Sequence, residues 1–193
     1  MKPKTYHEKF KNRGFTIIEV AVSIFILAVA IIGIYSAFSI VIVLALDNSD
    51  RFIASYLAQE GMEIIRNIRD ADWIAGNYWG TSFPDECFDN GCEVDYTTVS
   101  GGINSWPSVG KGNYLYIDNN GFYSYNTISE NPTKFKRKIK IEEDYVGIDK
   151  SIMKVSVEVT WDKKATMLNP KQDAGSCMES NCIILEEYMY NWY

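Results

Sequence analysis

Four cysteines and a single histidine are the residues of this sequence with the most obvious capacity for chemistry: Cys87, Cys92, Cys177, Cys182 and His7. The cysteines form two pairs with four residues between their members, so they could close disulfides or together offer four thiolates to zinc. The histidine has no second histidine with which to build a metal site or a catalytic triad. No phosphate-binding glycine loop and no nucleophile elbow occurs. We therefore expect no enzyme and no cofactor.

One carboxylate, Glu19, lies inside the longest apolar stretch of the chain, residues 15–46. After Glu19 the next charge is that of Asp47. The 27 uncharged residues from Val20 to Leu46 would form a helix about 40 Å long, enough to cross a hydrocarbon core of roughly 30 Å. An acid at the edge of such a span is costly unless it is paired, which makes Glu19 a functional candidate.

Charge is distributed unevenly around this stretch. Residues 1–14 carry five cations and one acid, a net charge of +4, whereas the 193-residue chain has a net charge of −6. The remainder therefore sums to −10, which disfavours direct binding to nucleic acid. By the positive-inside rule the N-terminus stays in the cytoplasm and the part after Leu46 is exported. A cleaved secretory signal fits poorly because its apolar core is about half as long, and a plain single-span anchor is the better alternative.

The octapeptide RGFTIIEV at residues 13–20, between a short basic segment and the apolar stretch, resembles the processing signal of type IV prepilins and type II secretion pseudopilins. In that family a membrane-embedded prepilin peptidase cuts after the glycine and methylates the new terminal amine. The resemblance implies that Gly14 ends the leader and that Phe15 becomes the methylated terminus. It also implies that Glu19 recruits the next subunit or sets its register. The resemblance is sharpest over residues 9–46.

The implied protein is a minor pilin or pseudopilin, a structural subunit of a type IV pilus or a type II secretion-like filament. Its expected partners are prepilin peptidase, other pilin subunits through the N-terminal helix, and membrane lipid. It would reside in the inner membrane with a cytoplasmic N-terminus, and then in the pilus or pseudopilus. An alternative of a different class is a single-span, membrane-anchored extracytoplasmic binding domain that never enters a filament.

A helix is expected to continue beyond the apolar stretch. Apolar or small residues recur with helical period from Phe52 and Tyr56 through Gly61 to Ile68. No proline interrupts this region, so we predict one helix from about Phe15 to Trp73. The predicted parts of the chain are a leader (1–14), a transmembrane or filament-core helix (15–46), its amphipathic continuation (47–75) and an exported, β-rich head (76–193).

The head shows the period-two alternation of half-buried strands. Phe135, Arg137, Ile139 and Ile141 alternate with lysines, and a second run follows over residues 153–161. Residues 182–190 suit a final strand, and the sequence around residues 119–121 (Asn-Asn-Gly) indicates a hairpin turn. Residues 76–112 are rich in turn-forming types and are expected to be irregular. The predicted fold class is α+β, a long N-terminal helix packed on a small antiparallel sheet, which resembles pilin architecture.

On the exported side disulfides persist, so we expect the cysteines to be paired and to bind no metal. Local pairing of Cys87 with Cys92 and of Cys177 with Cys182 is favoured, although four cysteines allow three connectivities. Zinc bound by all four remains an alternative.

Acids and aromatics in the head are expected to be structural. The acidic residues near the first cysteine pair suit a solvated loop better than a calcium site, because their spacing does not match an EF-hand loop. The aromatic residues suit a core better than a binding surface for a partner or sugar. These residues are Asp85, Glu86, Asp89, Glu93 and Asp95, and Tyr78, Trp79, Trp106, Tyr123, Trp192 and Tyr193.

Overall fold

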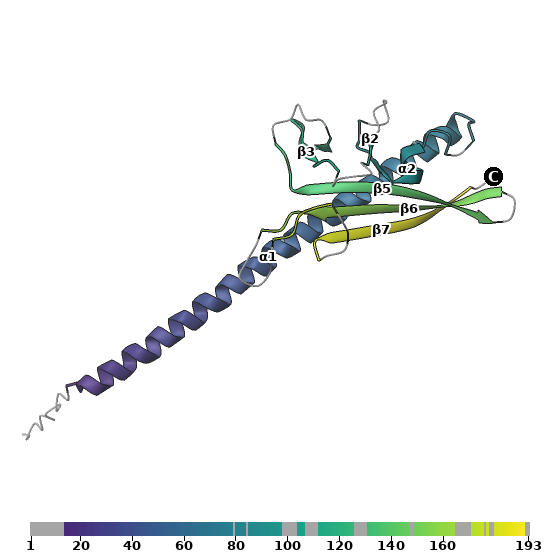
Figure 1. Cartoon of the computed structure of the whole chain (residues 1–193). Helices are drawn as coiled ribbons and strands as arrows, with labels where there is room; N and C mark the ends of the chain where they lie inside the picture. The colour runs from purple at the N-terminus through teal and green to yellow at the C-terminus, as the bar shows by residue number, and fades with distance from the viewer. Residues whose placement is uncertain are drawn as a thin grey trace, which may run out of the picture. The chain divides into compact units, whose positions relative to one another are not determined.

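The longest element of the computed structural model is the helix α1, from Ile17 to Ile74 (Figure 1). The prediction of one helix from about Phe15 to Trp73 is confirmed within two residues at each end. The chain divides into two compact units, Met1–Leu46 and Asp47–Tyr193. The structure describes residues 14–78, 80–83, 85–97, 104–106, 112–125, 131–146, 149–164, 171–175, 177 and 180–191.

Backbone geometry accounts for the end of α1. Gly76 has a φ of +74°, a value that residues with a Cβ rarely adopt. Its N–H donates to the carbonyl of Trp73, and the N–H of Asn77 donates to the carbonyl of Asp72, each over 3.0 Å. This pair of bonds satisfies carbonyls that have no helical partner and is the arrangement by which many helices end.

In the second unit, five antiparallel strands form one sheet in the order β2-β1-β5-β6-β7. The three long strands lie side by side in Figure 1 and supply most of the sheet. They coincide with the two strands that alternation predicted and with the final strand expected at residues 182–190, so the α+β prediction is confirmed. The strands are β1 (Cys92–Glu93), β2 (Asn104–Ser105), β5 (Phe135–Val146), β6 (Asp149–Trp161) and β7 (Cys182–Tyr190).

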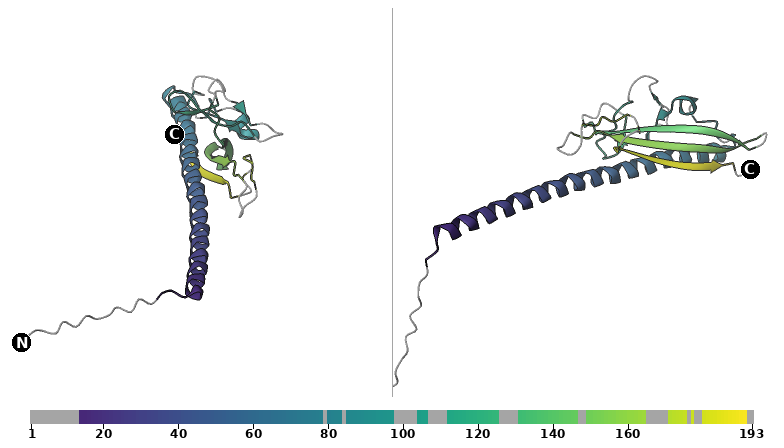
Figure 2. Two further views of the ribbon diagram at one scale, coloured as in Figure 1. Left: turned by 90° about the vertical axis from the view of Figure 1, so that its left-hand side faces the viewer. Right: turned by 60° about the horizontal axis from the view of Figure 1, so that its bottom comes forward.

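Residues 47–74 of α1 lie along one face of this sheet (Figure 2). Leu57 and Ile65 of the helix are buried against Ile139 of β5 and Val157 of β6 in a common core. Gly61 permits the close approach, because a Cβ there would lie 3.0 Å from the side chain of Val157. The helix and the sheet therefore share one apolar layer.

The predicted hairpin is present but does not join the main sheet. β3 (Tyr116–Ile117) pairs with β4 (Tyr123–Ser124) in a separate two-stranded sheet, and Tyr116 also forms an isolated bridge with Pro132. Gly121, with a φ of +87°, makes the turn, and its N–H donates to the carbonyl of Asp118. The asparagine-glycine pattern thus predicted the turn correctly.

Two expectations need correction. Residues 76–112, expected to be irregular, include the short helix α2 (Asp85–Asp89) and the strands β1 and β2. Phe52 and Tyr56, expected on the buried stripe of the helix, are 68% and 70% exposed. The buried stripe instead passes through Leu57, and Tyr56 lies about 100° away from it around the helix axis.

Candidate functional site

The start of α1 is closed by a reciprocal pair of side chains. The carboxylate of Glu19 accepts hydrogen bonds from the backbone N–H and the hydroxyl of Thr16, each over 2.9 Å. The N–H of Glu19 donates in return to the Thr16 hydroxyl oxygen over 3.3 Å. Thr16 immediately precedes the helix and Glu19 is its third residue, so the two form a capping box. The carboxylate is thereby held at the N-terminal end of the helix, where the helix dipole favours negative charge.

This cap was missed in the sequence, although its signal was present. Threonine followed three residues later by glutamate, just before an apolar run, is the pattern of a capping box. The pattern shows that Glu19 has a partner in its own chain. Since the cap uses no residue before Thr16, it does not require the leader.

The predicted cleavage position, between Gly14 and Phe15, is exposed. Phe15 is 85% exposed, and a Cβ placed on Gly14 would meet no atom within 4 Å. Gly14 is also not among the described glycines with a positive φ. Among the residues that the structure describes, neither packing nor backbone strain therefore calls for glycine at this position. The helix α1, which begins two residues after Phe15, is long and apolar enough to cross a membrane.

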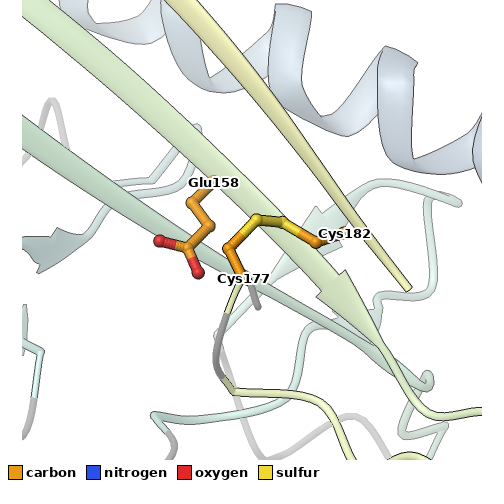
Figure 3. Close-up of side chains that lie close together, drawn as sticks. All are labelled: Glu158, Cys177 and Cys182. Carbon is orange, nitrogen blue, oxygen red and sulfur yellow. A yellow bond between two sulfur atoms is a disulfide. The ribbon is translucent and has the colours of Figure 1, made fainter. Parts of the chain in front are cut away.

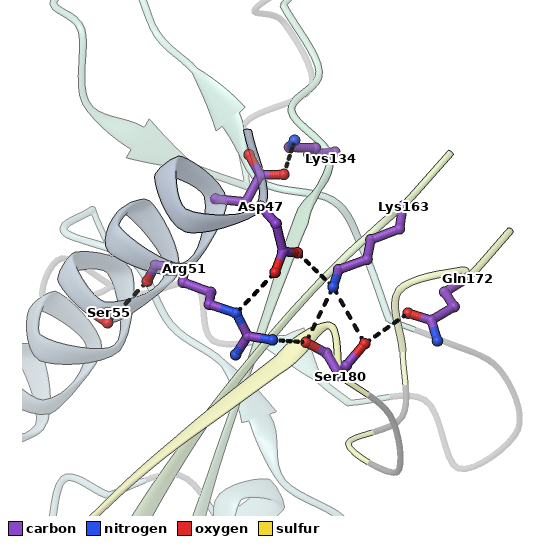
Figure 4. Close-up of polar contacts among 8 residues, drawn as sticks. Asp47, Arg51, Ser55, Lys134, Lys163, Gln172 and Ser180 are labelled. Carbon is purple, nitrogen blue, oxygen red and sulfur yellow. Dashed lines mark hydrogen bonds and ion pairs between the residues drawn. The ribbon is translucent and has the colours of Figure 1, made fainter. Parts of the chain in front are cut away.

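The first charged residues after the apolar stretch bind the head. Asp47 forms an ion pair with Lys163, 2.5 Å between carboxylate and ammonium, and accepts a bond from Arg51 over 3.1 Å. Arg51 also donates to the carbonyl of Ser180 over 2.7 Å. Figure 4 shows Asp47 between Arg51 and Lys163, both of which also reach Ser180. Asp50, one turn along the helix, forms an ion pair with Lys134 over 2.5 Å. We call these six residues the basal cluster: Asp47, Asp50, Arg51, Lys134, Lys163 and Ser180.

The basal cluster is tied to the core and has a defined charge state. Arg51 and Lys163 lie 5.8 and 5.7 Å from the ring of the buried Trp161, positions suited to cation–π attraction. Burial raises the pKa of Asp47, but hydrogen bonds and charge from Lys163 and Arg51 outweigh burial, so its pKa lies below the usual value. Asp47 is therefore ionised at neutral pH and retains both partners.

The four cysteines form two disulfides, Cys87–Cys92 and Cys177–Cys182, which is the local pairing. The carboxylate of Glu158 on β6 lies beside the second disulfide (Figure 3). Both sulfurs of that group are bonded to each other, so they are not free to ligate zinc in this form of the chain. The disulfides close two short loops, consistent with a structural use of the cysteines.

The two disulfides are expected to differ in their resistance to reduction. Cys87 and Cys92 are fully buried in the core, whereas Cys177 and Cys182 are half-buried. Thiol exchange requires access to a sulfur, so the core disulfide must wait for local opening. We expect Cys177–Cys182 to be reduced at least about tenfold faster, since roughly 1.4 kcal/mol of opening cost gives that factor. Timed alkylation with peptide mass spectrometry measures both rates, and equal rates would contradict this assignment.

Glu158 is expected to make the head more stable in mild acid than at neutral pH. Burial raises the pKa of its carboxyl, although Lys138 and the N–H of Cys177 partly offset this. A raised pKa contributes stability below the unfolded value and loses it as pH rises through the folded value. Glu158→Gln should therefore raise the melting temperature at pH 7 and have little effect near pH 4. Glu142→Gln is the control of opposite sign, because a hydrogen bond from Lys140 lowers the pKa of Glu142. Thermal unfolding in detergent at both pH values provides the measurement.

The acids near the first disulfide are divided between two roles. Glu93 is buried and accepts bonds from the backbone and side-chain N–H groups of Asn113, and Asp95 accepts one from the N–H of Tyr125. Asp85, Glu86 and Asp89 are exposed on α2. The carboxylates of Glu93 and Asp95 thus accept hydrogen bonds from amide groups of the head.

The aromatics singled out in the sequence do not form one surface in the described part of the chain. Trp106 is buried and Tyr123 packs against the core, as expected for structural residues, whereas Tyr78 is 59% exposed. Trp79, Trp192 and Tyr193 lie outside the described residues.

Comparison with known proteins places the N-terminal segment in a class. Residues 9–35 match the prokaryotic N-terminal methylation motif. This motif is the prepilin-type signal of type IV pilins and pseudopilins, so the chain carries that signal ahead of its apolar helix and its pilin-like α+β arrangement. The motif indicates a structural protein and fits a single-pass membrane anchor. Searches among curated proteins and among solved structures found no match.

Proposed function

We propose that the chain is a minor pilin or pseudopilin that is cut between Gly14 and Phe15, methylated on the new amine, and assembled into a filament. In this proposal residues 1–14 are the leader, residues 15–46 the anchor and filament-core helix, and residues 47–75 its continuation under the head. The observation that supports it is the methylation motif at residues 9–35, which runs into the apolar helix that begins at Ile17.

Within the filament, Glu19 is proposed to pair with the methylated amine of a neighbouring subunit. Its carboxylate is already held at the helix start by Thr16, so little further ordering is required. In lipid there is no hydrophobic driving force for helices to associate. Polar contacts of this kind can supply the attraction between two helices and fix their register. The two oxygens of a carboxylate can accept from the cap and from an ammonium together.

Processing is tested with a pair of glycine variants. Gly14→Val should abolish cleavage and leave the fold unchanged, because a Cβ there meets no atom of the described residues within 4 Å. Gly33→Val is the matched control, since Gly33 also has no neighbour within 4 Å of a Cβ. Intact mass of the membrane-extracted proteins is the measurement. The control should begin at a methylated Phe15 and the Gly14 variant should retain residues 1–14.

Other outcomes of this experiment reject the proposal. If the unaltered protein retains Met1, or is cut elsewhere, it is not a prepilin peptidase substrate. The chain would then be an anchored or secreted extracytoplasmic domain. Correct processing without recovery in filaments would favour the anchored binding domain.

A further inference from the structure

The peptide bond proposed for cleavage lies directly outside the helix. Gly14, Phe15 and Thr16 are not helical, and α1 begins at Ile17. The first bond of the helical ladder runs from the N–H of Val20 to the carbonyl of Thr16 over 3.2 Å. The carbonyl of Gly14, which water must attack, and the amine of Phe15, which must leave, both precede this first bond.

The capping box prevents the helix from beginning earlier. In a helix that began one residue earlier, the N–H of Glu19 would donate to the carbonyl of Phe15. It donates instead to the hydroxyl oxygen of Thr16 over 3.3 Å, and the carboxylate of Glu19 accepts from the N–H and the hydroxyl of Thr16. One residue earlier still, the N–H of Ile18 would bond to the carbonyl of Gly14, the group that water must attack.

The methylation motif is a second, independent observation at this boundary. It covers residues 9–35, so it spans both the bond after Gly14 and the capping box of Thr16 and Glu19. A peptidase acts on a helical segment only after that segment has opened locally. Gly14 and Phe15 need no such opening, because both lie outside the helix and are exposed, Phe15 by 85%. The helix boundary therefore leaves the bond ready for a peptidase.

We propose that Thr16 is a positioning residue for processing: as the cap of α1, it keeps the Gly14–Phe15 bond out of the helix and open to prepilin peptidase. This inference rests on the proposed function, because it requires cleavage after Gly14. Without the cap, unpaired N–H groups would lie at the edge of the apolar span, where little water is present to bond them. Extension of the helix through Phe15 moves these groups outward, and for part of the time the bond is then helical.

The test measures hydrolysis of the full chain in detergent by purified prepilin peptidase, with Thr16→Val as the variant. Valine keeps the shape of threonine and removes the hydroxyl. The peptidase binds only the fraction of the chain whose bond is outside the helix, so KM should rise about fivefold with kcat unchanged. Fivefold corresponds to the roughly 1 kcal/mol typical of a helix cap. Cleavage still reaches completion with time, so mature subunits remain available for assembly.

Further variants separate capping from other roles of these side chains. Thr16→Ser restores a hydroxyl at the cap and should restore KM. Glu19→Ala removes the other half of the capping box and should raise KM to a similar extent, whereas Glu19→Gln keeps the box and should not. Ser23→Ala is the matched control within the helix, because its hydroxyl donates to the carbonyl of Glu19 over 2.7 Å and takes no part in the cap. It should leave KM unchanged.

The carbonyl ¹³C chemical shift of Phe15, measured on the same samples, reports the backbone conformation and should move toward helical values in Thr16→Val. An unchanged or lowered KM for Thr16→Val overturns the proposal. A raised KM without the helical shift, or without a similar rise for Glu19→Ala, assigns Thr16 to direct contact with the peptidase and also overturns it. If the unaltered chain is not cleaved after Gly14, the proposed function itself fails and this inference fails with it.

Discussion

A Glu19→Gln chain is expected to be cleaved and methylated normally and to be lost from filaments. Glutamine can replace glutamate in a capping box, so the start of α1 should survive. It cannot pair with an ammonium, and removal of one partner of a buried ion pair costs about 3–5 kcal/mol, which is more than a hundredfold in an equilibrium. The measurement is the fraction of the subunit in sheared filaments relative to membranes, by quantitative immunoblot.

Thr16→Val is the control that separates capping from assembly. It removes the hydroxyl that donates to Glu19 and keeps the charge. The expected cost is only the loss of a helix cap, about 0.5–2 kcal/mol, and assembly should persist. If Thr16→Val is as defective as Glu19→Gln, the role of Glu19 is to cap the helix. If Glu19→Gln assembles normally, the proposed pairing with a neighbouring amine is wrong.

Arg137→Ala is expected to destabilise the head by about 3–5 kcal/mol, the second large effect. Arg137 is fully buried on β5 and donates to the carbonyl of Leu57 on α1 over 3.0 Å and to that of Val94 over 2.7 Å. It also lies 3.4 Å from the carboxylate of Glu60. Alanine would remove one donor from each of these two carbonyls and open a cavity beside Gly61. Thermal unfolding of the full chain in detergent reports the change.

Two further variants make this result interpretable. Lys140→Ala, on the same strand but half exposed, should change the unfolding free energy by less than about 0.5 kcal/mol. Arg137→Lys keeps the charge but not the two-pronged donor, so it should not restore stability. A loss of under about 1 kcal/mol for Arg137→Ala would mean that water or Glu60 compensates for the guanidinium, and the bridging role would be withdrawn.

Local sequence patterns were sufficient for the elements and for the N-terminal signal. The apolar run and the absence of proline predicted α1. Alternation predicted β5 and β6, and it placed Arg137 on the same face as Phe135 and Ile139. These features depend on neighbours within a few residues. The resemblance at residues 13–20 likewise needs only adjacent residues, and the motif match over residues 9–35 supports it.

Long-range contacts were not accessible in the same way. Nothing near Asp47 in the sequence specifies Lys163 as its partner, and nothing near Arg137 specifies the carbonyl of Leu57. The strands β1 and β2 have two residues each, too few for a period to be recognised. The capping box was different, because its pattern is local and was open to prediction.

The order in which the sheet is made has a consequence for how the head folds. Leu57 and Ile65 are covered by strands that begin at Phe135, so the helix is synthesised long before its partners. At about 5–20 residues per second, Val157 follows Gly61 by roughly 5–20 s. Contacts that span 80 residues, such as that between Arg137 and Leu57, also form slowly because of their high contact order. The sheet that covers the helix can therefore be completed only after β6 has been synthesised. Until then the apolar face of residues 54–68 is exposed to aggregation and proteolysis.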